Sequence, residues 1–290
     1  MESPQLLQLA DGRTLEYWDA RPAGSDLDLV VFWHHGTPNV GEPPAPLMEA
    51  SARRGIGWVS HSRPGYGTST RDEGRDMAAA ARDVEALADA LGIARFAVMG
   101  HSGGGPHALA CAALLPEHVC AVVSIAGLAP LEADGMTWDQ EDWFAGMYPG
   151  GQAELRAALE GAQSLGVRLA EAPWDPQMFT PGDIVALEGE WQWLNRVVEL
   201  AHEGGPQGMI DDDLASVRRW GFDPVDVTAP TLLIHGARDR VVPPRHGEWL
   251  HHRIDGSELW LEPEDSHVSI LRLADEALDW LLTTARSTRP

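Results

Sequence analysis

The residues around Ser102 constrain the fold more than any other stretch of this chain. An apolar run, Phe96 to Met99, ends at Gly100, and a run compatible with a helix begins after Pro106. Between them Ser102 stands in the pattern G-x-S-x-G, with Gly100 two residues before it and Gly104 two residues after it. Glycines at both flanks let a strand and a helix approach without Cβ clashes. The pattern therefore predicts a sharp strand-to-helix turn that exposes the Ser102 hydroxyl from a strained backbone conformation.

Apolar runs and helical patterns alternate on both sides of this turn. Such alternation predicts a mostly parallel sheet whose two faces are covered by helices. Residues 6–19 are consistent with a hairpin. The strands that we expect elsewhere are the apolar runs 27–33, 56–60, 96–99, 119–126, 231–236 and 258–261, and the helices include 45–54, 76–91, 106–115 and 268–284.

Residues 130–225 interrupt this alternation. They contain no convincing strand pattern, only helical patterns between glycine- and proline-containing breaks. They hold 18 acidic and 5 basic residues, a net charge of −13, and six of the 12 tryptophans. We therefore predict a core formed by 1–129 and 226–290, with 130–225 inserted as a helical cap.

The charge, the apolar runs and the cysteines of the chain limit which partners, cell compartment and metals can be expected. The formal net charge is −23, and all 21 basic residues are arginine, which argues against nucleic acid or an anionic membrane surface as a partner. The start of the chain has no secretory-signal pattern, and no apolar run could span a bilayer, so we expect a cytoplasmic protein. Cys111 and Cys120 are interpreted as buried thiols, and no cysteine–histidine spacing indicates zinc.

A serine hydroxyl becomes a good nucleophile only when a base takes its proton and a third group orients that base. Asp239 directly follows the strand 231–236, and His267 lies between the strand 258–261 and the last helix. The chain order Ser102, Asp239, His267 is the one used by one fold of serine hydrolases. Asp265 competes for the role of the acid, but we expect its side chain to point to solvent.

An oxyanion needs two backbone N–H groups directed to where negative charge develops. One is expected from Gly103, the residue after the serine. The other is expected from Thr37, in the loop that follows the strand 27–33, where Pro38 stiffens the turn. His34 and His35 are expected to hold this loop by hydrogen bonds.

With these motifs in place, the chain resembles an α/β-hydrolase-fold serine hydrolase with an inserted helical cap. The resemblance implies an eight-stranded, mostly parallel sheet and acyl-enzyme chemistry without a metal or an organic cofactor. Within that superfamily it is most similar to esterases and aminopeptidases of the proline iminopeptidase kind, which usually have two glycines and a proline after the first histidine and a tryptophan after the serine. This chain has Gly36-Thr37-Pro38 and Gly103 instead. The matching residues are His35-Gly36-Thr37-Pro38, Arg63-Pro64-Gly65-Tyr66-Gly67-Thr68-Ser69, Gly100-His101-Ser102-Gly103-Gly104, Gly236-Ala237-Arg238-Asp239 and His267.

Two features of the expected cap bear on binding. Its tryptophans exceed what packing of a small lid needs, so we expect Trp138, Trp143 or Trp191 to line an apolar substrate pocket. The run Asp211-Asp212-Asp213 is interpreted as the N-terminal cap of a helix through Val217 rather than as a metal site.

These observations favour hydrolysis of a small apolar carboxylic ester by Ser102, and they leave a homodimer open. An aminopeptidase stays as an alternative, in which Glu188, Glu190 or Glu199 would hold a substrate ammonium. A carbon–carbon bond hydrolase with the same triad is a second alternative. A third is a ligand receptor that keeps the fold without catalysis.

Overall fold

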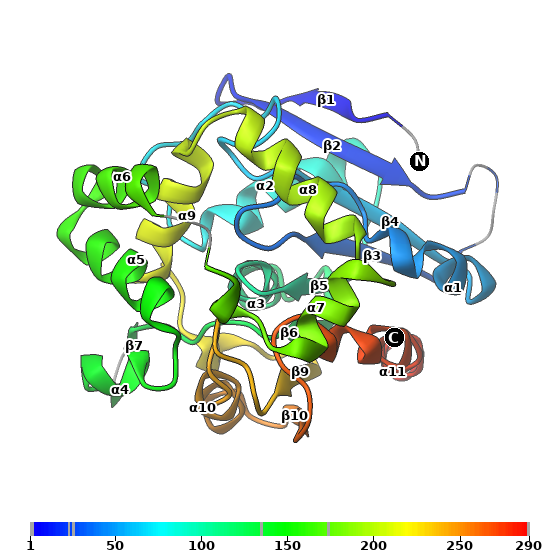
Figure 1. The fold of residues 1–290 in the computed structure, drawn as a ribbon. Helices are drawn as coiled ribbons and strands as arrows, with labels where there is room; N and C mark the ends of the chain where they lie inside the picture. Colours follow the sequence, from blue (N-terminus) through cyan, green and yellow to red (C-terminus); the bar gives the residue numbers. More distant parts are fainter. Residues whose placement is uncertain (1–2, 23, 25–26, 134–135, 173–174, 289–290) are drawn as a thin grey trace.

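The computed structural model describes residues 3–22, 24, 27–133, 136–172 and 175–288, and its centre is one eight-stranded sheet (Figure 1). The strand order is β1-β2-β4-β3-β5-β6-β9-β10. β1 pairs antiparallel with β2 and β2 with β4, whereas every other neighbouring pair is parallel. The predicted eight-stranded, mostly parallel sheet is therefore confirmed. The strands are β1 (Gln5–Gln8), β2 (Thr14–Ala20), β3 (Leu29–His34), β4 (Ile56–His61), β5 (Phe96–His101), β6 (Val119–Ile125), β9 (Thr231–Gly236) and β10 (Glu258–Glu262).

Helices cover both faces of this sheet, as the alternating pattern predicts. One face packs against η1 (Ala45–Leu47), α1 (Met48–Arg53), η4 (Ser269–Leu273) and α11 (Ala274–Ser287). The other face packs against α2 (Ala79–Ala90), α3 (Gly104–Leu114) and α10 (Arg245–Arg253). The expected helix at 268–284 differs in detail, because its first turn is a 3₁₀ helix, η4.

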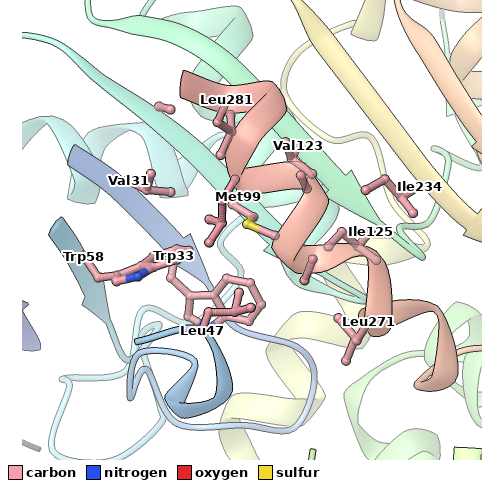
Figure 2. Close-up of a cluster of buried hydrophobic side chains, with 14 of the residues drawn as sticks. Val31, Trp33, Leu47, Trp58, Met99, Val123, Ile125, Ile234, Leu271 and Leu281 are labelled. Carbon is pink, nitrogen blue, oxygen red and sulfur yellow. The ribbon is translucent and has the colours of Figure 1, made fainter. Parts of the chain in front are cut away.

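The strand β3 shows how a continuous apolar run serves two layers at once. Successive side chains of a strand point to opposite faces. Val31 and Trp33 accordingly belong to the cluster under α11, and Phe32 to the cluster under α2 and α3. Figure 2 shows the first of these clusters, in which Val31, Met99 and Val123 from neighbouring strands lie near Leu281 of α11.

The segment between β6 and β9 is mainly helical. Its helices α5, α6 and α9 pack together on one side of the molecule, while α7 contacts α8 and η4 (Figure 1). Two antiparallel strands of two residues each, β7 (Glu132–Ala133) and β8 (Met136–Thr137), correct the expectation that this segment has no strand. The helices are α4 (Gln140–Phe144), α5 (Pro149–Glu160), α6 (Ala162–Glu171), η2 (Pro176–Met178), α7 (Pro181–Glu188), α8 (Trp193–Glu203), α9 (Gln207–Ser216) and η3 (Pro224–Asp226).

Three further observations concern the whole described chain. None of its helices combines the length and the apolarity that crossing a bilayer would require. Cys111 and Cys120 are both buried thiols. In the same described ranges, no three His, Cys, Asp or Glu side chains gather where they could hold a metal ion.

Candidate active site

Ser102 lies in the turn between β5 and α3, at the carboxyl ends of the parallel strands. Its φ of 55° is in the left-handed region, which residues other than glycine rarely adopt. The flanking glycines allow the turn, because a Cβ on Gly100 would overlap the carbonyl group of Gly104, and a Cβ on Gly104 would overlap that of His34. The Ser102 N–H donates to the carbonyl of Ile125 at 2.8 Å, which ties the strained turn to β6.

The structure brings Ser102, His267 and Asp239 together although they are far apart in the chain. Nε2 of His267 lies 2.9 Å from Oγ of Ser102, and Nδ1 lies 2.8 Å from Oδ2 of Asp239. A carboxylate only accepts hydrogen bonds, so the proton sits on Nδ1 and Nε2 is free to accept from the Ser102 hydroxyl. The other oxygen of Asp239 accepts from the backbone N–H groups of Val241 and Val242 at 2.8 and 2.9 Å, which fixes the carboxylate.

The charges of this group favour a basic imidazole. Burial alone lowers the pKa of His267, but the contact with Asp239 more than offsets it, so the pKa lies above its ordinary value. Burial raises the pKa of Asp239, yet His267 and His235 together bring it below its ordinary value. Near neutral pH, Asp239 is therefore ionised and beside a histidine that can take a proton.

Two side chains outside this group position the His267 loop. His101 donates from Nε2 to the His267 carbonyl at 2.9 Å. Asp183 of α7 accepts from the backbone N–H groups of Val268 and Ser269 at 2.8 and 2.9 Å. Asp183 also completes a capping box with Thr180, and this capping pattern is the sequence signal that could have drawn attention to Asp183.

The side chain of Asp265 does not point to solvent as expected. It is buried and paired with Arg272 at 2.7 Å.

Thr37 and Gly103 lie against each other beside Ser102. A Cβ on Gly103 would overlap Oγ1 of Thr37 and would lie 3.3 Å from the Thr37 backbone nitrogen. The Thr37 side chain therefore occupies space that any larger residue at 103 would need. Gly103 also precedes the first residue of α3, where the helix dipole favours negative charge.

The expectation that Asp211, Asp212 and Asp213 form an N-terminal cap is wrong. All three lie inside α9, which begins at Gln207, and all three are buried. Asp212 can be buried because the guanidinium groups of Arg63 and Arg75 contact it at 2.7 and 2.5 Å. Burial raises the pKa of Asp212, but these two cations dominate and hold it well below its ordinary value.

Asp212 also connects α9 to the loop that carries Thr37. Its Oδ2 accepts from Oγ1 of Thr37 at 2.7 Å and from the Tyr66 hydroxyl at 2.8 Å. Arg63 donates to the carbonyl of Gly36 at 2.9 Å, and its backbone N–H donates to Nε2 of His35 at 3.0 Å. His35 thus holds this loop as expected, through a buried network that has Asp212 at its centre.

A cavity of about 950 Å³ opens beside Ser102 and His267. Thr37 and Gly103 line it, and the helices of the insertion supply most of the remaining wall. The apolar part includes Phe179, Leu187, Leu194 and Val198, and the charged part includes Glu154, Arg168 and Asp213. No sequence motif indicates that any of these seven residues belongs to a site.

The expected tryptophan lining is wrong, because none of Trp138, Trp143 and Trp191 belongs to the cavity wall. Trp143 is fully buried and donates from Nε1 to the carbonyl of Ala129 at 3.0 Å. Trp191 packs against Trp193, and Trp138 stacks on Trp249. These rings fill the contacts between the insertion and the sheet layers, where large buried surfaces are needed. Trp174, also counted in the sequence, lies outside the described residues.

Comparisons with known proteins show the family and the fold to which this chain is similar. The family model described as "alpha/beta hydrolase fold" matches residues 30–272. A pimeloyl-[acyl-carrier protein] methyl ester esterase of Neisseria meningitidis is 30% identical over 216 residues, which cover 73% of this chain and 76% of that protein. The mouse serine hydrolase BPHL is 27% identical over 236 residues, 80% of this chain and 70% of that protein. The crystal structure of a bromoperoxidase from Bacillus anthracis superposes with a TM-score of 0.72 at 20% identity, covering 97% of this chain and all of that one.

Proposed function

This chain belongs to the alpha/beta hydrolase family, and we propose that it is a serine hydrolase that cleaves a carboxylic ester with Ser102 as the nucleophile. The observation that supports this most strongly is the unbroken line of hydrogen bonds from Ser102 through His267 to Asp239, at 2.9 and 2.8 Å. This line ends at a cavity large enough for a small organic ester.

In the proposed first step, Oγ of Ser102 attacks the ester carbonyl carbon while Nε2 of His267 takes the hydroxyl proton. The carbonyl oxygen becomes an anion that accepts hydrogen bonds from the backbone N–H groups of Thr37 and Gly103. The Asp239 carboxylate stabilises the resulting imidazolium. The tetrahedral intermediate collapses when His267 gives its proton to the leaving alkoxide, which departs as an alcohol and leaves an acyl group on Ser102.

In the second step, water attacks the acyl carbon, and His267 takes one of its protons. The second tetrahedral intermediate expels Oγ of Ser102, which regains its proton from His267, and the carboxylic acid is released. The same two N–H groups stabilise both intermediates. Removal of one such donor from a serine hydrolase costs about 10²–10³ in kcat, so the position of Thr37 is central to this scheme.

We propose an ester rather than an amide for two reasons. One of the relatives named above is an esterase by its printed name. The aminopeptidase alternative relied on Glu188, Glu190 and Glu199, but these side chains are exposed and line no part of the described cavity wall. We further propose that 130–225 acts as the cap over the core 1–129 and 226–290, since its helices supply many of the side chains of the wall, among them Leu155, Leu169, Leu187 and Leu194.

A substrate panel with a Ser102→Ala variant tests the proposed function. The panel consists of p-nitrophenyl esters of increasing acyl chain length and aminoacyl p-nitroanilides. We expect turnover of the esters that falls by about 10³-fold or more in the variant. We also expect a fluorophosphonate to label the wild-type chain at Ser102 and to leave the variant unlabelled. Turnover of anilides alone would replace this proposal with a peptidase, and failure of the label would favour a receptor.

A further inference from the structure

Asn39 is a polar residue of the cavity that the proposed catalytic scheme leaves unused. It follows Thr37 by two positions and lines the cavity together with Ser102 and His267. Only 5% of its surface is exposed. Within the described part of the chain, its carboxamide forms no hydrogen bond, and both of its polar atoms keep accessible surface. Because the rest of the residue is buried, this accessible surface belongs to the cavity wall.

The carboxamide lies close to the nucleophile. A Cβ on Gly36 would be 3.1 Å from Nδ2 of Asn39 and 3.6 Å from Cβ of Ser102. The amide nitrogen and the nucleophilic residue therefore border the same small space beside Gly36. When Oγ of Ser102 attacks an ester, the atoms of the substrate within a few bonds of the carbonyl carbon come within reach of the carboxamide.

The backbone on both sides of Asn39 is anchored. Oγ1 of Thr37 donates to Asp212 at 2.7 Å, and the backbone N–H of Val40 donates to the carbonyl of Val197 on α8 at 3.2 Å. These contacts hold the loop before a substrate arrives. A contact with the Asn39 side chain therefore requires little further ordering of the backbone, which favours tight and selective binding.

The surroundings of the carboxamide change when the cavity is filled. Water can pair with it in the empty cavity, but a bound substrate displaces this water. If only hydrocarbon replaces the water, the buried amide loses its hydrogen bonds, and binding becomes weaker. A substrate group that pairs with the amide avoids this loss. A site with a buried polar group of this kind selects against analogues that lack the matching group.

The ester group itself does not need this side chain in the proposed scheme. The backbone N–H groups of Thr37 and Gly103 pair with its carbonyl oxygen, and His267 protonates its leaving oxygen. The carboxamide is therefore available to a substituent beside the ester. It carries no charge, so it offers no counter-charge to an ionised substituent. A hydroxyl group both donates and accepts, so it can pair with either polar atom of the carboxamide.

We propose that Asn39 is a specificity-determining residue that binds a hydroxyl group of the substrate next to the scissile ester. The substrate class is therefore an ester with a hydroxyl group close to the ester carbonyl, on the acid side or on the alcohol side. Its hydrocarbon part lies along the apolar wall that includes Leu187, Leu194 and Val198. This inference rests on the proposed function for the position of the ester, and its test measures binding without turnover.

Calorimetric binding to the full-length Ser102→Ala variant separates this contact from catalysis. The probes form two pairs, and within each pair a hydroxyl group replaces a methyl group. One pair consists of methyl esters that carry the hydroxyl or the methyl on the carbon next to the carbonyl. The other pair consists of the hydroxyethyl and propyl esters of one unbranched acid.

In one of the two pairs, we expect the hydroxyl member to bind at least about 10-fold more tightly than the methyl member. That pair identifies the side of the ester that meets Asn39. Equal or weaker binding of the hydroxyl member in both pairs would overturn the inference, and so would a lack of binding by all four probes.

A second substitution in the Ser102→Ala background tests whether Asn39 causes the preference. Asn39→Leu keeps the approximate size of the side chain and removes both polar atoms, so it should abolish the preference for hydroxyl over methyl. Continued binding of the methyl members shows that this variant is folded. A preference that survives Asn39→Leu would assign it to other residues and overturn the inference.

Asn195→Leu is the matched control. Asn195 lines the same cavity, but it is exposed, and its Nδ2 already donates to the carbonyl of Leu187 at 2.9 Å. This variant should keep the hydroxyl preference, whatever its effect on the absolute affinity. Hydrolysis of the propyl ester by the wild type is measured in parallel. A hydroxyl preference without hydrolysis would reject the proposed function, whereas hydrolysis without the preference would reject only the role of Asn39.

Discussion

The carboxylate of Asp212 accepts a hydrogen bond from the hydroxyl of Thr37 at 2.7 Å, although 175 positions separate the two residues. Asp212 lies on α9 in the inserted helices, and Thr37 lies in the loop after β3. The same carboxylate contacts Arg63, which donates to the carbonyl of Gly36. The direction of the Thr37 N–H therefore depends on a residue of the insertion as well as on the sheet.

Replacing the Thr37 hydroxyl tests this dependence. Thr37→Val keeps the shape of the side chain and removes its hydrogen bond to Asp212, so the loop loses one of its anchors. We expect kcat on a p-nitrophenyl ester to fall about 10-fold, a fraction of the loss for a whole oxyanion donor, with KM little changed. Thr37→Ser keeps the hydroxyl and should restore most of kcat. Equal kcat values for Thr37→Val and the wild type would contradict a positioning role.

The buried ion pairs of Asp212 with Arg63 and Arg75 should also contribute strongly to the free energy of unfolding. Asp212→Asn leaves the guanidinium groups of Arg63 and Arg75 buried without their counter-charge. We expect a loss of about 3–5 kcal/mol in the free energy of unfolding at pH 7, measured by urea denaturation. Glu49→Gln, in the exposed pair with Arg53, should cost no more than about 1 kcal/mol. A loss of only about 1 kcal/mol for Asp212→Asn would show that the charge of Asp212 is not needed to keep Arg63 and Arg75 buried.

The pH dependence of this stability has a definite sign. The pKa of Asp212 is lower in the folded chain than in the unfolded chain. Its contribution is therefore complete above the unfolded pKa of about 4 and decreases as the pH falls toward the folded pKa. The difference in unfolding free energy between the wild type and Asp212→Asn should accordingly be constant from pH 5 to 7 and shrink below about pH 4. A difference that grows on acidification would show that Asp212 is not held ionised.

The pH–rate profile reports on His267. The proposed base must be neutral, and Asp239 raises the pKa of His267 above its ordinary value in spite of burial. We expect kcat/KM to rise with pH and to reach half of its maximum above about pH 6.5. Asp239→Asn removes the carboxylate, so the midpoint should move to lower pH while kcat falls about 10⁴-fold. A midpoint that moves upward in Asp239→Asn would contradict the electrostatic role of Asp239.

The sequence alone predicts which residues lie together where the signals are local. Ser102, Asp239 and His267 each follow a recognisable apolar strand in the expected order, and parallel strands end at one edge of a sheet. The run Asp211 to Asp213 resembles a helix start, because aspartates favour that position, and the sequence does not reveal the buried arginines that compensate the charge of Asp212. Those partners, Arg63 and Arg75, are 149 and 137 positions away.

The residues that line the cavity could also not be predicted from local sequence patterns. The sequence shows how many tryptophans the insertion contains. Whether a given tryptophan is buried in the core or lines the cavity depends on which surfaces the folded helices bring together. Trp143 and Trp191 have large surfaces that the contacts with the sheet layers use, while Leu187 and Leu194, from α7 and α8, face the cavity. No pattern in the sequence distinguishes a residue of the core from a residue of the cavity wall, because both kinds lie in amphipathic or apolar helical stretches.

The different environments of Trp143 and Leu187 lead to opposite effects on stability and binding. Trp143→Phe removes the indole donor to the carbonyl of Ala129 and leaves space in a closed core, so we expect unfolding to become easier by about 1–3 kcal/mol. The KM for a long-chain p-nitrophenyl ester should stay within about twofold of the wild type, since Trp143 does not line the cavity. Leu187→Ala shortens the apolar wall, so KM for that ester should rise about 5- to 30-fold, equivalent to a loss of about 1–2 kcal/mol of contact. A rise in KM for Trp143→Phe with no change for Leu187→Ala would place the substrate against the tryptophan after all.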